Sequence, residues 1–226
     1  MSAEFLVIAP HVDDEALGCG GILDERFHVH YCGVEDRHAV SRAERLDEAA
    51  ACAEFLGFSW SLEEEANTVN DYRVPHLVCQ LEKIVNHLRP NTVFLPYPSY
   101  NQDHRAVFDA ALTALRPHDV NHFVRNVLLY EEIQVAGWPR GEDLLRNLAF
   151  QPTVFVPIDI ERKIEAYRCH ASQVRPMRSP DLLTTLAKWR GFQSGCEYAE
   201  AFQPVRLADP RSLALGKLRE KGCAHG

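Results

Sequence analysis

The segment His11-Val12-Asp13-Asp14-Glu15 gathers an imidazole and several carboxylates in one short stretch. It follows the apolar run Phe5-Leu6-Val7-Ile8-Ala9, so we expect it to form the turn between a buried strand and a helix. Open α/β sheets bind their ligands at such carboxyl ends of strands. His11 and Asp14 are spaced to turn toward one point, which suits a divalent metal, and Asp13 between them can face a water that the metal activates.

A second polar segment, Asn101-Gln102-Asp103-His104-Arg105, follows the apolar run Thr92–Pro96 after a short loop. Its His104 would complete a set of three ligands with His11 and Asp14. Catalytic zinc sites typically use three nitrogen or oxygen ligands and leave one position open for water. The pattern therefore indicates a metal-dependent hydrolase. Zn²⁺ is the first expectation, and Fe²⁺ or Co²⁺ also suits this ligand set.

Each of these polar residues also has a purely structural interpretation. Asp13 or Asp14 can cap the following helix by accepting from its free N–H groups. His104 in isolation would be a solvent-facing residue at the start of a helix, and Glu15 could complement a helix dipole. Asp103 is expected either to support a neighbouring metal ligand or base, or to cap its own helix.

The rest of the chain alternates short apolar runs with amphipathic segments, which predicts repeated βα units. The expected strands are 5–9, 28–34, 58–62, 92–96, 127–132 and 153–157, and the expected helices are 14–26, 39–56, 75–88, 103–115, 160–173 and 181–189. This alternation predicts an α/β fold with a Rossmann-like, doubly wound, mainly parallel sheet and helices on both faces. If the strand order begins 3-2-1-4, the first and fourth strands are neighbours, and His104 meets His11 and Asp14 at the switch point.

Length and patterning favour one domain. A chain of 226 residues can bury one substantial α/β core, and neither a low-complexity linker nor an internal repeat divides it. The pattern weakens and becomes polar from Pro204 onward. We therefore expect a single catalytic domain over residues 1–203 and a surface tail over residues 204–226.

Charge and cysteine content exclude several classes of protein. The chain has 24 basic and 32 acidic residues, and its net charge of −8 argues against a duplex nucleic-acid binder. No apolar run approaches the roughly 20 residues of a membrane-spanning helix. The N-terminus also lacks the basic region followed by an apolar region that is typical of a secretory signal peptide. We therefore expect a soluble, cytoplasmic protein. The 7 cysteines form no CxxC pair, which indicates reduced thiols rather than a disulfide framework or a thiolate zinc site.

Four blocks of sequence together resemble one known family. Pro10-His11-Val12-Asp13-Asp14-Glu15 is similar to a PHxDDE signature, and Asn101-Gln102-Asp103-His104-Arg105 to an NxDHR motif. A third block comprises Lys163-Ile164-Glu165-Ala166 and Ser172-Gln173, and a fourth runs from Arg190-Gly191 to Tyr198-Ala199-Glu200-Ala201-Phe202. On these motifs the chain resembles the LmbE/PIG-L family of zinc-dependent deacetylases, which remove acetyl groups from N-acetylglucosaminyl and related substrates.

The resemblance implies roles for the residues of the first two blocks. It implies that His11, Asp14 and His104 bind zinc and that Asp13 is the general base. Asn101 stands where many relatives have a histidine that stabilises the oxyanion. An asparagine can donate an amide N–H to a developing negative charge, but it cannot transfer a proton. Its structural alternative is an Asx turn or a helix cap.

Two arginines and two aromatic residues are weaker candidates for substrate binding. The resemblance places Arg45 and Arg178 near the substrate, and the Arg178 guanidinium could bind a phosphate. Their structural alternatives are a solvated helix face for Arg45 and a loop salt bridge for Arg178. Tyr100 and Trp138 could stack on a sugar ring or pack locally. The remaining histidines have no comparable spacing to a carboxylate motif, so we expect surface or hydrogen-bonded core positions for His28, His30, His38, His76, His87, His118, His122, His170 and His225.

The sequence thus predicts a zinc-dependent hydrolase that removes the N-acetyl group from an N-acetylated amino sugar or small glycoconjugate. One alternative is an amidase for a different N-acyl conjugate, which acetate release from N-acetylglucosamine derivatives would distinguish. A catalytically silent scaffold of the same fold would lack affinity for zinc. A Rossmann-type nucleotide-binding protein is less favoured, because Gly18-Cys19-Gly20-Gly21 lies inside the expected helix rather than in the first turn.

Overall fold

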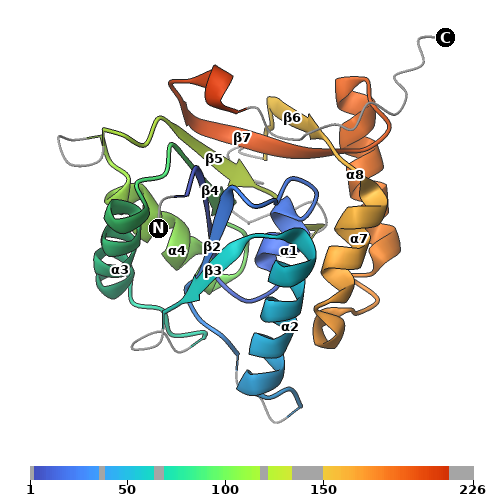
Figure 1. The fold of residues 1–226 in the computed structure, drawn as a ribbon, viewed down its shortest axis with the longest axis horizontal. Coiled ribbons are helices and arrows are strands. Elements are labelled where there is room, and N and C mark those ends of the chain that lie inside the picture. The colour runs from blue at the N-terminus through green and yellow to red at the C-terminus, as the bar shows by residue number, and fades with distance from the viewer. Residues whose placement is uncertain (1–2, 36–38, 64–68, 118–121, 134–149, 214–226) are drawn as a thin grey trace.

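The centre of the molecule is a sheet with helices on both faces (Figure 1). The computed structural model describes residues 3–35, 39–63, 69–117, 122–133 and 150–213. Over these residues the sheet has seven strands in the order β3-β2-β1-β4-β5-β7-β6. The strands from β1 to β5 pair in parallel, and β7 runs antiparallel to both β5 and β6. The predicted α/β fold with a mainly parallel, doubly wound sheet is confirmed.

The elements of the described residues have the following bounds. The strands are β1 (Phe5–Ala9), β2 (Phe27–Tyr31), β3 (Ser59–Leu62), β4 (Thr92–Pro96), β5 (Asn126–Tyr130), β6 (Val154–Pro157) and β7 (Ala199–Leu207). The α-helices are α1 (Asp14–Cys19), α2 (Arg42–Leu56), α3 (Val74–Leu88), α4 (Gln102–Ala114), α7 (Ile160–Arg168) and α8 (Pro180–Ser194). Two short 3₁₀ helices are η1 (Ala171–Gln173) and η2 (Pro210–Ser212). None of these helices is long and apolar enough to cross a membrane.

Strand β1 occupies the middle of the sheet, between β2 and β4, as the predicted order 3-2-1-4 requires. All five of its residues are buried, because helices cover both faces. Phe5 and Val7 pack in the core beneath α1, α2, α7 and α8, whereas Leu6 and Ile8 pack in the core beneath α3 and α4. The carboxyl ends of β1 and β4 therefore lie side by side, and the segments that follow them meet at one edge.

Helix α1 is much shorter than the predicted helix over residues 14–26. It ends at Cys19, because the glycines that follow favour a helix end and the N–H of Gly21 donates to Glu200 Oε1 at 2.8 Å instead of continuing the helix. Gly18 permits the close approach to the sheet: a Cβ there would lie 2.2 Å from a ring carbon of Tyr130. The predicted helix over 160–173 also divides, into α7 and η1.

The predicted end of the domain is wrong, because strand β7 crosses it. The sequence analysis missed this strand, and the boundary expected between residues 203 and 204 falls inside it. The pattern was weak because Val205 and Leu207, in the last part of the strand, stay partly exposed at the surface. Beyond β7, the side chain of Asn126 donates to the Asp209 carbonyl at 3.0 Å and to Ser212 Oγ at 2.9 Å. Residues 204–212 thus belong to the folded body, and 214–226 lie outside the described residues.

Two histidines of β2 are hydrogen-bonded core residues, as predicted. The ring of His28 lies 2.9 Å from Ser59 Oγ and 2.8 Å from Ser61 Oγ, and the ring of His30 lies 2.9 Å from Ser61 Oγ. Burial lowers the pKa of both imidazoles to about 4. The folded protein therefore holds both rings neutral at a pH where an unfolded chain would protonate them.

We predict that His28 and His30 make folding stability fall with acidity. Because unfolded histidines bind protons below about pH 6.5, the stability present above that pH is lost as the pH falls toward about 4. At about pH 5.5 the loss amounts to about 1 kcal/mol per histidine. Urea unfolding at about pH 7 and about pH 5.5 measures it for wild type and for a His28→Asn/His30→Asn variant. An equal loss in both proteins would assign the acid sensitivity to other groups.

Candidate active site

The turn between β1 and α1 has an unusual backbone. Asp13 has a φ of 127°, a region that residues other than glycine rarely adopt. The side chain of Asp14 closes the turn, because its Oδ2 accepts from the backbone N–H of His11 at 2.8 Å. Asp13 precedes α1 but makes no capping bond with its carboxylate. The Asp13 side chain is thereby free to make contacts outside the helix, and the helix-cap alternative does not describe it.

The structure brings His11, Asp14 and His104 together, as the sequence predicts. One potential ligand atom from each lies within 4.8 Å of the other two. His11 Nδ1 is 3.4 Å and His104 Nε2 is 3.5 Å from the same oxygen, Asp14 Oδ2. All three residues are buried, with exposed fractions of 8%, 1% and 4% in chain order. Their spatial convergence is established, and their binding of a metal stays a prediction.

Carboxylates hold the two imidazoles by the ring nitrogens that face away from Asp14. His11 Nε2 lies 3.0 Å from Asp103 Oδ2, and His104 Nδ1 lies 3.4 Å from Glu132 Oε1. Metal-binding histidines are commonly oriented in this way by a carboxylate on the second nitrogen. The donor set and its support therefore fit a divalent metal. Sequence analysis missed Glu132, although its position two residues after the end of β5 is a signal that could have identified it.

The charges of the site are strongly coupled. Burial alone would lower the pKa of His11, but the hydrogen bonds that its ring donates to the carboxylates of Asp103 and Asp14 outweigh this effect and raise the pKa to about 10. Burial lowers the pKa of His104 to about 4, against the attraction of Asp14. Burial would raise the pKa of Asp14, yet His104 and His11 hold it below its usual range. The site therefore presents an anionic Asp14 and a neutral His104, and a metal would displace the proton of His11.

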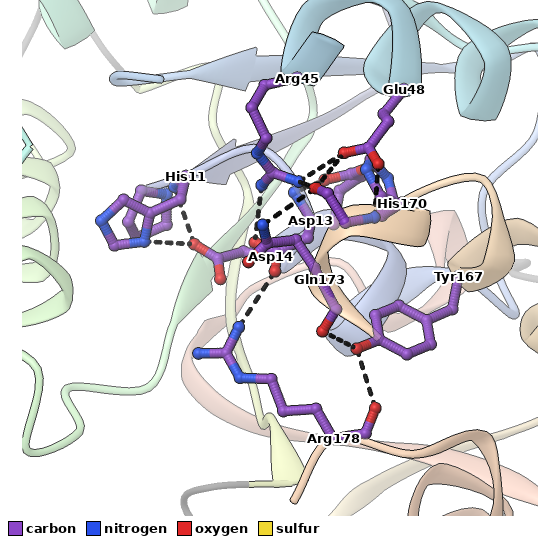
Figure 2. Close-up of polar contacts among 12 residues, drawn as sticks. His11, Asp13, Asp14, Arg45, Glu48, Tyr167, His170, Gln173 and Arg178 are labelled. Atoms are coloured by element: carbon purple, nitrogen blue, oxygen red, sulfur yellow. Dashed lines mark hydrogen bonds and ion pairs between the residues drawn. The ribbon is translucent and has the colours of Figure 1, made fainter. Parts of the chain in front are cut away.

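Asp13 lies beside this group, between two arginines (Figure 2). Its Oδ2 accepts from Arg178 Nη1 at 3.0 Å, and its Oδ1 is 3.7 Å from Arg45 Nη2. Burial and the charge of Asp14 raise the pKa of Asp13 to about 6, against the opposing effect of the two guanidinium groups. Such a carboxylate can take up and release a proton near neutral pH, which a general base must do.

Both arginines occupy the site rather than the surface. Arg45 is 1% exposed, and its Nη1 donates to Glu48 Oε2 at 2.7 Å, so the interpretation of Arg45 as part of a solvated helix face is wrong. Glu48 also accepts from the backbone N–H of Ser172 at 2.7 Å, which ties α2 to η1. Arg178 forms a salt bridge, as its structural alternative expected, but the partner is Asp13 of the site itself.

Asn101 and Asp103 begin helix α4. Asn101 Oδ1 accepts from the backbone N–H of Asp103 at 2.9 Å, so the helix-cap interpretation of Asn101 is confirmed. Asn101 also lines the same cavity as His11 and Asp13. Its action as an oxyanion donor stays a prediction. The Asp103 carboxylate does not cap its helix but holds His11 and accepts from the N–H of Asn70 at 2.8 Å.

A buried pair of charges lies behind the turn. Glu15 Oε1 is 2.7 Å from His170 Nε2, and Glu15 Oε2 accepts from the backbone N–H of Asp13 at 3.1 Å. Despite burial, His170 lowers the pKa of Glu15 and Glu15 raises that of His170, so the two form an ion pair. Glu15 thus fixes the Asp13 peptide. His170 is the core histidine that the sequence analysis expected, but this contact could not be read from spacing.

The residues around Asp13 form the wall of a polar cavity. The described lining residues are His11, Asp13, Glu35, Arg45, Asn70, Asn101, Gln173, Arg175 and Arg178. Tyr100 is not among them, and Trp138 lies outside the described residues. A cavity lined by charged and amide side chains suits a ligand rich in hydroxyl or ionic groups.

Comparison with known proteins shows what the chain is similar to. Residues 6–115 match the PIG-L family model, described as GlcNAc-PI de-N-acetylase. No curated protein sequence matches the chain significantly. Among solved structures, the conserved protein TT1542 from Thermus thermophilus is similar, with a TM-score of 0.70 and 21% identity over 92% of this chain and 96% of that one.

Two further structures with named activities share the fold. N,N'-diacetylchitobiose deacetylase from Pyrococcus horikoshii has a TM-score of 0.68 and 21% identity over 89% of this chain and 83% of that one. GalB, the 4-carboxy-2-hydroxymuconate hydratase from Pseudomonas putida KT2440, has a TM-score of 0.69 and 20% identity over 91% and 96% of the two chains. One fold thus carries different reactions, and the residues of the site must decide between them. Both polar segments of the site lie inside the residues that are similar to the PIG-L family.

Proposed function

We propose that this protein is a metal-dependent hydrolase that removes the N-acetyl group from an N-acetylated amino sugar or a small glycoconjugate. The observation that carries the proposal is the convergence of His11, Asp14 and His104 beside the buried carboxylate of Asp13. The family match and the fold shared with a deacetylase support the same reaction. The polar cavity next to these residues suits a sugar.

His11, Asp14 and His104 would hold the metal, and Zn²⁺ is the proposed ion, although Fe²⁺ and Co²⁺ suit the same ligands. When bound, such an ion supplies acidification of water and polarisation of the amide carbonyl. Asp103 and Glu132 keep the two imidazole rings in place by their contacts at 3.0 Å and 3.4 Å.

Asp13 performs both proton transfers in this proposal. Its carboxylate takes a proton from the attacking water and later gives it to the departing amine, so that acetate and a free amino sugar leave. Arg178 and Arg45 hold the carboxylate in the cavity and contact the substrate. Asn101 donates its amide N–H to the oxygen on which negative charge develops.

Two alternative functions can be compared with the site. An amidase for another N-acyl conjugate would use the same residues and would differ only in the product released. A nucleotide-binding role is disfavoured, because the absence of a side chain at Gly18 serves its packing against the Tyr130 ring. Measurement of acetate released from N-acetylglucosamine derivatives therefore tests the proposed reaction directly.

We predict that metal binding and turnover can be separated by two variants. Asp13→Asn keeps the three ligands and should retain metal while kcat falls by about 10²- to 10⁴-fold, because the base is lost. His11→Ala removes a ligand and should lose both metal and activity. Elemental analysis of dialysed protein, together with acetate release, measures the two effects. An Asp13→Asn protein with wild-type turnover would remove Asp13 from the mechanism.

We predict that Asn101 can be tested without disturbing its capping bond. Asn101→Asp keeps an oxygen that accepts from the Asp103 N–H, so the melting temperature should stay close to that of wild type. It replaces the N–H donor by a negative charge, and kcat should fall by at least about tenfold. Asn101→Ala serves as the comparison, because it loses both the cap and the donor. Wild-type kcat in Asn101→Asp would limit Asn101 to capping.

A further inference from the structure

Arg105 ends the second polar segment of the site, and neither the metal ligands nor the proton transfers explain it. It lies in the first turn of α4, directly after His104. Its Nη1 donates to the carbonyl oxygen of Ser99 at 3.1 Å and also to the carbonyl oxygen of Tyr100. Both acceptors belong to the loop that leads from β4 to α4. The guanidinium of a helix residue therefore holds the loop that precedes the same helix.

The contacts of Arg105 fix the peptide group that precedes Asn101. This group consists of the Tyr100 carbonyl and the Asn101 N–H, which the planar peptide bond keeps in one orientation relative to each other. The carbonyl accepts from Arg105, and the N–H donates to Ser99 Oγ at 3.2 Å. Ser99 is buried, with an exposed fraction of 6%. The peptide group is therefore held at both of its polar ends, by Arg105 at one end and by a buried hydroxyl at the other.

The side chain amide of Asn101 has its oxygen in use and its nitrogen available. The Oδ1 atom accepts from the backbone N–H of Asp103 at 2.9 Å, which determines which end of the amide faces the helix. The Nδ2 atom makes no hydrogen bond with any described residue. Because Asn101 lines the cavity beside His11 and Asp13, this NH₂ group is the one that remains for a ligand. The direction in which it points depends on the peptide group that Arg105 holds.

We propose that Arg105 is a positioning residue, which fixes the peptide before Asn101 and thereby directs the Asn101 NH₂ group into the cavity. The inference rests on the proposed function, in which Asn101 donates to the oxygen that becomes negative. A donor that is already in place needs no reorientation during the reaction, and this is where such a group gains its catalytic effect. Arg105 suits the task because Nη1 carries two N–H groups in fixed directions, one for each carbonyl. It touches no substrate itself.

The experiment measures kcat and KM for acetate release from the methyl glycoside of N-acetylglucosamine by the metal-loaded protein. Arg105→Met keeps most of the aliphatic stem but removes the N–H donors. We expect its kcat to fall by about tenfold with a nearly unchanged KM, because a displaced donor weakens an interaction that forms only in the transition state. Arg105→Lys keeps a donor for one of the two carbonyls, so its kcat should lie between those of wild type and Arg105→Met.

Two further comparisons distinguish the positioning of Asn101 from general support of the fold. Arg116→Met is the matched control and should keep wild-type kcat, because Arg116 Nη1 donates to the Thr113 carbonyl at 2.6 Å in the last turn of the same helix. In the Asn101→Ala background, Arg105→Met should cause no further fall in kcat, since Arg105 acts only through Asn101. A similar fall in both backgrounds, or wild-type kcat in Arg105→Met, would overturn the inference.

The outcomes also separate this inference from the proposed function. Absence of acetate with the wild-type protein and every N-acetylglucosamine derivative would overturn the proposed function, whereas the order of the Asn101 amide is still measured by NMR. The relaxation of its side-chain NH₂ group reports this order, and its resonance is identified by its loss in Asn101→Ala. We expect an ordered group in wild type and Arg116→Met and a mobile one in Arg105→Met. Equal order in all three proteins would contradict the role of Arg105.

Discussion

The site depends on carboxylates that hold the backbone of the β1–α1 turn. Asp14 accepts from the N–H of His11, and Glu15 accepts from the N–H of Asp13. The φ of 127° at Asp13 costs on the order of 1–3 kcal/mol, so it persists only where the surroundings impose it. The ion pair with His170 keeps Glu15 charged in a fully buried position and thereby maintains its bond to the turn.

Sheet topology then brings the remaining functional groups to this turn. Because β1 and β4 pair in parallel, the start of α4 delivers His104 and Asp103 to the same edge as His11. Strand β5 pairs with β4 and delivers Glu132 to the far nitrogen of His104. Three adjacent strand ends thus combine the predicted metal ligands with the carboxylates that orient them. Such orientation is what distinguishes a prepared site from a chance cluster of polar residues.

The charge state of Asp13 depends both on the β1–α1 turn and on the arginines of the cavity. Burial and Asp14 favour the protonated form of Asp13, whereas Arg178 and Arg45 favour its charged form. The same two arginines are anchored through Glu48 and through the Tyr167 hydroxyl to α2, η1 and α7. Arg178, in the second half of the chain, therefore contributes to the charge state of a carboxylate that lies near the beginning of the chain. A fold shared with both a deacetylase and a hydratase does not by itself specify this balance.

The sequence alone determined the features that depend on neighbouring residues. Short runs of apolar residues predicted the strands β1 to β6. The positions of His11, Asp14 and His104 after two of these runs predicted the candidate metal site. Only the tertiary structure revealed the pairs formed between distant segments: Glu15 with His170, Glu132 with His104, Arg45 with Glu48 in the interior, and β7 between β5 and β6. Periodicity reports which face of an element is buried, whereas a buried charge is stable only beside a particular partner. That partner is chosen by how the chain packs in three dimensions, so no local pattern records it.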